Sequence, residues 1–269
     1  FTDPPYGLES QSDKDPKKEI PFNGVYKVKT NGEVILLVDS IARPNGIAFF
    51  PGEQQLIVAS SDGRNPNWFL YDVVGDSLTN GRLFYNDIAS AKGQPGLPDG
   101  LKIDSKGNVF ATGPGGIWIF NKEGKVLGKL KLKNPTSNCA LSPDEKTLYV
   151  IPTGQADMMA YPIETHGKIG KGKVFCSLKQ PEGKTNTGGD GLTIDIKGNL
   201  YITSGLGIQI FSSTGMYLGT IAFPEQPANC CFAGKDMKTF YVTARTGLYK
   251  VELPIAGHRF AGRIASPPV

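Results

Sequence analysis

The sequence predicts an all-β protein with the architecture of a six-bladed β-propeller, and three observations support this prediction. First, 34 Gly and 20 Pro in 269 residues argue against a helical fold, because both residues are unfavourable inside helices. Second, a unit of about 91 residues repeats along the chain and divides into two sub-units. Third, each sub-unit, of roughly 40 to 50 residues, has the pattern of about four strands and their turns, which is typical of a propeller blade.

Two segments that align without gaps define the repeat. Residues 99–112 (DGLKIDSKGNVFAT) match residues 190–203 (DGLTIDIKGNLYIT) at an offset of 190 − 99 = 91. A second family of segments alternates with these two, and its members contain Asn45, Asn138 and Asn229. Division of the 269 residues by ~45 residues per blade gives about six blades.

The first sub-unit shows how strands and turns follow each other. Residues 25–29 and 34–38 are β-rich runs that flank an Asn-Gly pair, which is a hairpin signature. We expect residues 1–269 to form a single domain. The first blade lacks an inner strand before Phe1, and we expect the C-terminal tail, residues 255–269, to supply it, because closure removes free sheet edges.

Composition narrows the range of partners. The net charge is only +4, from 29 Lys and Arg against 25 Asp and Glu, and the basic residues are scattered, so we expect no nucleic-acid partner. No apolar run approaches the ~18 residues of a membrane span, so we expect a soluble protein without a membrane partner. Four cysteines without CxxC spacing and two distant histidines argue against a structural zinc site. We expect a monomer or weak oligomer, and the compartment stays open between cytoplasm and export.

Polar residues recur where the inner strand of each blade should begin. Asn and Asp are poor strand formers, so strand propensity does not explain them. Inner strands of a propeller begin around one mouth of the central channel, and converging carboxylate and amide oxygens suit a hard cation. Turn formation or hydrogen bonds between blades is the alternative explanation, and it suffices most readily for Asn138 and Asn229. The recurring residues are Asn45, Asp99, Asn138, Asp190 and Asn229.

Several motifs resemble the gluconolactonase branch of the SMP-30/gluconolactonase/LRE-like family. They are FTDPPYGL (1–8), RPNGIAF (43–49), LPDGLKID (97–104), GNVFATGPGGIWIF (107–120) and TSNCALSPDEKTLYV (136–150), and residues 185–262 resemble the family's C-terminal portion. The resemblance implies a six-bladed propeller with one divalent metal in its channel that hydrolyses sugar lactones. Ca²⁺ is the first candidate for the metal, and Mg²⁺, Mn²⁺, Zn²⁺ and Fe²⁺ are alternatives.

The resemblance also implies the ligands. The family's metal ligands are the Glu of an EGP motif, the Asn of RPNG and the Asp of PDG. The Asn corresponds here to Asn45 and the Asp to Asp99, and this Asp is also the family's proposed general base. This sequence lacks EGP and SPND, and its blade order looks rotated or duplicated. Asp190, two blades after Asp99, is our candidate for the missing carboxylate ligand.

The expected activity is therefore a metal-dependent lactonase. A non-catalytic propeller with a degraded metal site and a promiscuous metal-dependent esterase or phosphotriesterase are the alternatives. We expect substrate contacts from loops at the channel mouth and from the two remaining repeated asparagines, with Tyr6 and Trp68 able to stack on a sugar ring. The candidate substrate-binding residues are Asn138, Asn229, Asp3, Tyr6, Asp62, Trp68 and Thr112.

Overall fold

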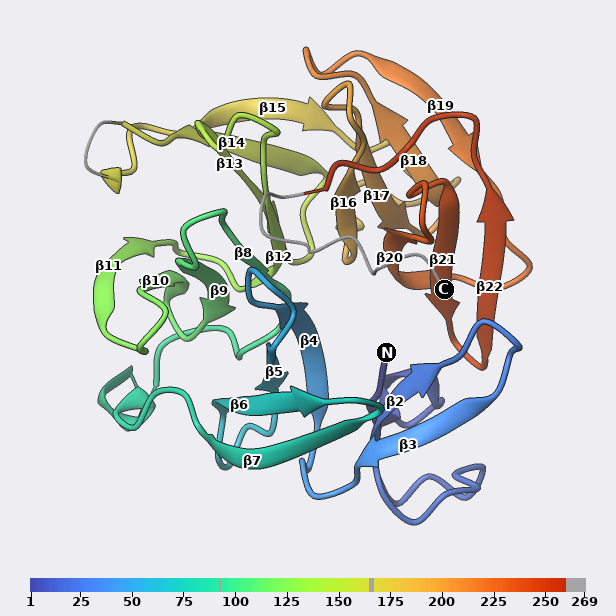
Figure 1. The fold of residues 1–269 in the computed structure, drawn as a ribbon. Coiled ribbons are helices and arrows are strands. Elements are labelled where there is room, and N and C mark those ends of the chain that lie inside the picture. The colour runs from blue at the N-terminus through green and yellow to red at the C-terminus, as the bar shows by residue number, and fades with distance from the viewer. Residues whose placement is uncertain (92, 165–166, 260–269) are drawn as a thin grey trace. The chain divides into compact units, whose positions relative to one another are not determined.

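The computed structural model describes residues 1–91, 93–164 and 167–259, and their regular secondary structure is almost entirely β-strand (Figure 1). The strands form six antiparallel sheets, four with four strands and two with three. Within each sheet, neighbouring strands are consecutive in sequence, as expected of propeller blades. The residues divide into two compact units, which meet in sequence after Lys133, and each is described separately below.

The first unit, residues 1–133, holds three sheets and two short 3₁₀ helices. Its elements are β1 (Thr2–Asp3), η1 (Pro5–Gly7), β2 (Gly24–Val28) and β3 (Val34–Val38); β4 (Pro44–Phe49), β5 (Gln55–Ser60), β6 (Asn67–Val74) and β7 (Ser77–Leu83); η2 (Ile88–Ala91); and β8 (Leu101–Ile103), β9 (Val109–Gly113), β10 (Gly116–Phe120) and β11 (Val126–Lys131).

The second unit begins at Asn134 and also holds three sheets. Its strands are β12 (Thr136–Leu141), β13 (Thr147–Pro152), β14 (Asp157–Pro162) and β15 (Lys173–Ser177); β16 (Leu192–Ile194), β17 (Leu200–Ser204), β18 (Gly207–Phe211) and β19 (Tyr217–Ile221); and β20 (Pro227–Ala233), β21 (Thr239–Ala244) and β22 (Gly247–Glu252).

The described part of the C-terminal tail pairs with β16. The backbone N–H of His258 donates to the carbonyl of Ile194, and that of Ile196 donates to the carbonyl of Ala256. The sheets β1-β2-β3 and β20-β21-β22 have three strands each, and in the first of them β1 lies beside β4, the first strand of the next sheet. Residues 260–269 lie outside the described part, so closure of the first blade by the tail stays a prediction.

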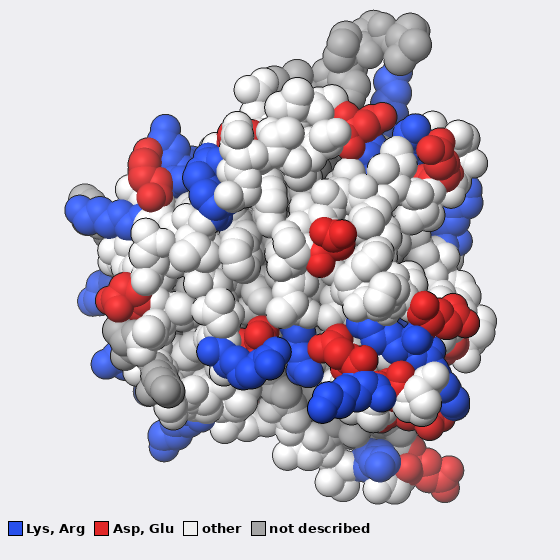
Figure 2. Space-filling view, turned by 90° about the horizontal axis from the view of Figure 1, so that it is seen from below, with Lys and Arg blue, Asp and Glu red and all other residues white. Residues whose placement is uncertain are grey.

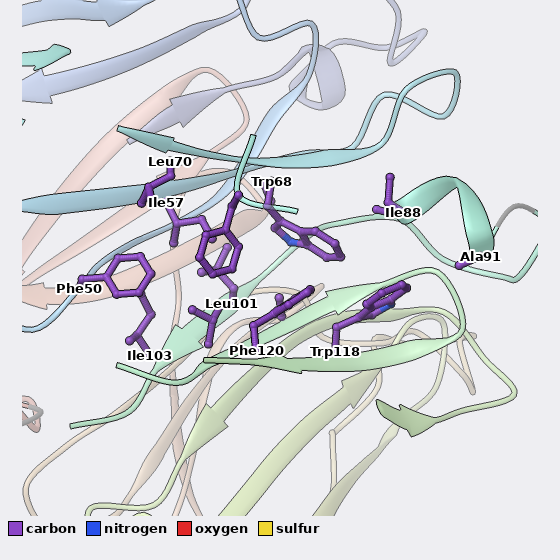
Figure 3. Packing of buried hydrophobic residues seen from close by; sticks show 14 residues of the cluster. Phe50, Ile57, Trp68, Leu70, Ile88, Ala91, Leu101, Ile103, Trp118 and Phe120 are labelled. Atoms are coloured by element: carbon purple, nitrogen blue, oxygen red, sulfur yellow. The ribbon is translucent and has the colours of Figure 1, made fainter. Parts of the chain in front are cut away.

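A cluster of aromatic rings forms the core of the first unit (Figure 3). Trp68 from β6 and Trp118 and Phe120 from β10 are almost completely buried, and Figure 3 shows their side chains facing one another between these strands. The ring centroids of Trp68 and Phe120 lie 5.2 Å apart, and those of Phe84 and Phe120 lie 5.4 Å apart, both edge-on. Such aromatic pairs add to the large apolar area that they bury, so this cluster stabilises the sheets that carry Asn45 and Asp99.

Charged side chains of both signs are interspersed on the face that Figure 2 shows, and basic residues do not gather into one patch there. Such a surface does not have the clustered basic footprint of a nucleic-acid-binding face. Among the described residues, no helix is long and apolar enough to cross a lipid bilayer.

Replacement of Phe120 by Ala should strongly destabilise the first unit. Phe120 is fully buried, and its truncation leaves a cavity among four aromatic partners, so we expect a loss of about 3–5 kcal/mol. Urea unfolding followed by far-UV circular dichroism measures this loss. Leu127→Ala on β11 is the control, because that side chain is 57% exposed, and we expect a change within about 0.5 kcal/mol. Equal effects of the two substitutions would contradict the assignment of this core.

Candidate functional site

The three repeated asparagines all lie at β-bulges near the start of an inner strand. The register with the neighbouring strand shifts between Pro44 and Ile47 in β4, between Thr136 and Asn138 in β12, and between Pro227 and Asn229 in β20. A bulge inserts an extra residue and redirects the adjacent side chains. The repeated position is therefore a point where the backbone, rather than the hydrophobic alternation, sets the direction of the side chain.

Gly46 brings Asn45 next to Asp99. A Cβ atom on residue 46 would lie only 2.0 Å from the carbonyl oxygen of Asp99, so the backbones of β4 and of the segment before β8 are in direct contact. The φ angle of Gly46 is not positive, so the glycine is required for this close approach and not for a turn. The structure thus places the two predicted ligands of the first unit on adjoining inner strands.

The second unit repeats this contact between β16 and β20. A Cβ atom on Gly191 would lie 2.5 Å from the Cα atom of Asn229, which places Asp190 beside Asn229. On the other side, the Ser137 hydroxyl donates to the carbonyl of Gly189 at 3.3 Å, which joins β12 to the segment before β16. Asn138 and Asn229 therefore lie on β12 and β20, which contact β16 on either side, and Asp190 lies just before β16.

The three asparagines differ in how they use their amide oxygen. Oδ1 of Asn138 accepts the backbone N–H of Cys139 at 3.0 Å, and Oδ1 of Asn229 accepts that of Cys230 at 2.9 Å. In Asn45 the other end of the amide is engaged, because Nδ2 donates to the Ser61 hydroxyl at 3.3 Å. Among the described residues, no hydrogen bond reaches Oδ1 of Asn45. Its carbonyl oxygen is thus available to a ligand, whereas those of the other two asparagines stabilise their own bulges.

Thr112 holds the backbone of Asp99. Its hydroxyl accepts the Asp99 N–H at 3.0 Å, and its own N–H donates to the carbonyl of Gly100 at 3.1 Å. Thr112 is fully buried, so the structure gives it a role in fixing Asp99 and no surface for a substrate. The matching Thr203 in the second unit accepts the N–H of Gly191 at 2.6 Å.

Ser61, which the sequence analysis did not single out, links two predicted site residues. Its Oγ lies 2.6 Å from Oη of Tyr6 and accepts from Asn45, as described above. The Arg43 guanidinium lies over the Tyr6 ring, 5.6 Å from its centroid. The repeat offers one signal for Ser61, since Thr153 carries a hydroxyl at the corresponding place after β13.

The remaining predicted substrate residues lie in three different settings. Asp3 is exposed on β1, and the protein atoms around it raise the pKa of its carboxyl, an effect that Lys18 partly offsets. Asp62 is buried and accepts hydrogen bonds from the backbone and Nε of Arg64 at 3.2 and 3.3 Å. Trp68 was expected in a loop, but it lies in β6 with no exposed surface, so its ring packs the core and is not accessible to a sugar.

Asp190 is the carboxylate whose charge the protein disfavours most clearly within this set. Desolvation by the surrounding protein raises the pKa of its carboxyl to about 6, although by accessible surface the residue is exposed. An adjacent cation would favour the charged form and lower this pKa again. Asp190 thus has an electrostatic environment in which a positive partner is favourable.

The donor set of the first unit fits a hard divalent cation. Asn45 offers an amide oxygen and Asp99 a carboxylate, which are the oxygen ligands that Ca²⁺ and Mg²⁺ prefer. Within the described residues there is no group of three or more His, Cys, Asp or Glu side chains that could hold a metal ion. A site here would therefore depend on amide oxygens as well as carboxylates.

Comparison of the sequence with known families gives two matches to one profile, the SMP-30/Gluconolactonase/LRE-like region, at residues 6–142 and 137–246. The gluconolactonase of Zymomonas mobilis is 38% identical over 155 residues, which are 56% of this chain and 43% of that protein. Pentonolactonase XacC of Haloferax volcanii is 25% identical over 134 residues, 48% of this chain and 45% of that protein. The aligned segment thus spans less than half the length of both relatives.

Solved structures show the same fold. A putative gluconolactonase superposes with a TM-score of 0.72 at 18% identity, over 88% of this chain and 83% of its own. A gluconolactonase from Xanthomonas campestris gives 0.67 at 25% identity, over 86% and 79%. A calcium-binding regucalcin from Agrobacterium tumefaciens gives 0.67 at 23% identity, over 87% and 84%.

These similarities confirm the predicted fold class, an all-β protein of the six-bladed β-propeller type. The family profile matches the sequence of this chain twice, which agrees with the internal repeat. Together the two matches cover residues 6–246. The chain belongs to the SMP-30/gluconolactonase/LRE-like family.

Proposed function

We propose that this chain carries the active site of a metal-dependent sugar lactonase, which opens the ring of an aldonolactone to give the hydroxy acid. The observation that carries the proposal is the backbone contact that brings Asn45, whose amide oxygen accepts no hydrogen bond among the described residues, next to Asp99 in the segment before β8. Membership of the family and the names of the two lactonase relatives support the choice of substrate class.

Asn45 and Asp99 of the first unit would hold the cation, and the role of Asp190 of the second unit as a further carboxylate ligand stays a prediction from the repeat. Ca²⁺ is our first candidate, a choice that the calcium-binding regucalcin of the same fold supports. A bound divalent ion polarises a carbonyl oxygen and makes water more acidic. The residues of the chain have to place that ion beside a carboxylate that can accept a proton.

We assign the role of proton acceptor to Asp99. Its carboxylate accepts a proton from the water that attacks the lactone carbonyl carbon, the ring C–O bond breaks, and the ring oxygen takes up a proton to become a hydroxyl group. Thr112 keeps the Asp99 backbone in place through the hydrogen bond to its N–H. The Tyr6 hydroxyl, on the Ser61 side of Asn45, would contact substrate hydroxyl groups.

Asp99→Asn should lower lactonase activity by about 10²–10⁴-fold, since it removes the proton acceptor. A pH-stat assay on glucono-1,5-lactone, corrected for spontaneous hydrolysis, measures the rate. Asp76→Asn in the turn after β6 is the matched control, because that exposed carboxylate pairs with Lys27 outside the site.

Addition of a chelator should abolish turnover, and added Ca²⁺ should restore it. Turnover that survives both the chelator and Asp99→Asn would refute the proposal. Retained Ca²⁺ binding without any turnover of lactones would instead favour the non-catalytic propeller.

Asp190→Asn should stabilise the chelator-treated protein in a pH-dependent way. The folded pKa of about 6 lies above the reference value of 3.8, so folding favours the protonated form and the wild type loses stability as pH rises from about 4 through 6. An amide has no such transition. The difference in melting temperature between Asp190→Asn and wild type should therefore increase from pH 4 to pH 7.

Asp72→Asn is the comparison for this experiment. Hydrogen bonds from Gln55, Asn80 and Arg82 lower the pKa of Asp72 to about 2, so its contribution to stability is complete above about pH 5, where the unfolded carboxyl is fully ionised. Its melting-temperature difference should change little between pH 4 and pH 5 and stay flat from pH 5 to pH 7. A flat profile for Asp190→Asn as well would contradict the electrostatic environment assigned to Asp190.

A further inference from the structure

We propose that Ser61 is a positioning residue that fixes the orientation of the Asn45 amide, so that the carbonyl oxygen is offered to a cation. The hydroxyl oxygen of Ser61 accepts a hydrogen bond from Nδ2 of Asn45 at 3.3 Å. This inference rests on the proposed role of Asn45 as a metal ligand, and it adds a residue that does not itself touch the metal.

An asparagine ligand has an orientation problem that a carboxylate lacks. The two ends of the amide have nearly the same shape, but only the carbonyl oxygen can bind a cation, and the NH₂ group carries two donors. Rotation about the terminal torsion exchanges the two ends, and this torsion is broad and roughly two-fold. Neighbouring groups must therefore favour one orientation if Asn45 is to bind a metal well.

The oxygen of Ser61 is an acceptor toward Asn45 in this structure. A serine hydroxyl has one proton and two lone pairs. The Ser61 hydroxyl donates to the carbonyl of Arg43 at 3.4 Å, and its oxygen lies 2.6 Å from Tyr6 Oη, where either hydroxyl can be the donor. With its proton directed at Arg43 or Tyr6, Ser61 presents a lone pair to Asn45, and Nδ2 is the end of the amide that this arrangement favours.

The surroundings hold the Ser61 hydroxyl in place. Ser61 is 3% exposed and follows β5 directly, where its backbone N–H donates to the carbonyl of Arg43 at 2.9 Å. Tyr6 is half-buried, and the Arg43 guanidinium over its ring restricts it further. The orienting contact is thus part of a buried network and not a mobile surface hydrogen bond.

The second unit shows the opposite arrangement at the matching place. The Thr153 hydroxyl, which follows β13, lies 3.0 Å from the hydroxyl of Ser137, and Oδ1 of Asn138 is engaged by the backbone N–H of Cys139. Among the three repeated asparagines, the described contacts orient only Asn45 with its carbonyl oxygen away from protein donors. Ser61 accounts for this difference.

Titration calorimetry with Ca²⁺ on chelator-treated protein tests the inference. We expect Ser61→Ala to weaken Ca²⁺ binding by about 10–100-fold, as is usual when a group that orients a ligand is removed. In an Asn45→Asp background, Ser61→Ala should weaken Ca²⁺ binding by less than about threefold. A carboxylate has two equivalent oxygens, so residues 45 and 61 no longer couple through the orientation of an amide.

Ser60→Ala is the matched control. Ser60 is 2% exposed and one residue earlier in the strand, so the same atoms are removed from a buried serine on the opposite face. Circular dichroism and melting temperature check that every variant is folded. If Ser61→Ala does not fold, Ser61→Cys keeps the size and weakens the acceptor, and its effect should again be confined to the Asn45 background.

The possible outcomes separate this inference from the proposed function. If Asn45→Ala weakens Ca²⁺ binding but Ser61→Ala does not, the metal site stands and the positioning role is refuted. Equal losses from Ser61→Ala in both backgrounds would mean that Ser61 acts through general packing, which also refutes it. Failure of the wild type to bind Ca²⁺ or Mn²⁺ would overturn the metal site and this inference together.

Discussion

The close approach of neighbouring inner strands is the constraint on which the site depends. Residue 46 can touch the carbonyl of Asp99, and residue 191 can touch the backbone of Asn229, only because both are glycines. A Cβ atom at either place would overlap backbone atoms, which cannot move as easily as the end of a side chain. This contact brings residues with short polar side chains on neighbouring chain segments next to each other in each unit.

The repeated asparagines show how one backbone feature can serve structure in one blade and, in the function that we propose, bind a ligand in another. The bulge is present in β4, β12 and β20. In the latter two strands the amide oxygen accepts the backbone N–H of the next residue in the bulge. In β4 a serine takes the other end of the amide, and the oxygen stays available. Equivalence in the repeat therefore does not imply equivalence in function.

The sequence was sufficient for the fold class, because it follows from the repeat. The strand pattern and the offset of 91 residues also single out Asn45 and Asp99, which the structure places next to each other through the backbone of Gly46, and their role as ligands stays a prediction. The sequence was not sufficient for Trp68, which we expected in a loop at the channel mouth. Strand β6 already begins at Asn67, and the ring of Trp68 packs in the hydrophobic core. Ser61 could not be identified either, because the direction of a hydroxyl proton depends on atoms of Arg43 and Tyr6 that are distant in sequence.

Charge explains why the orientation of one amide should matter so much at this site. The affinity of an oxygen site for Ca²⁺ depends on the number of charged ligands and on the rigidity of the site. In the first unit only one of the two proposed ligands is a carboxylate, so each neutral oxygen has to be well placed to contribute. An Asn45 amide turned the wrong way would point two N–H donors at a cation and would repel it. A buried serine that accepts from Nδ2 prevents this orientation without adding charge, and thus makes an amide an effective substitute for a second carboxylate.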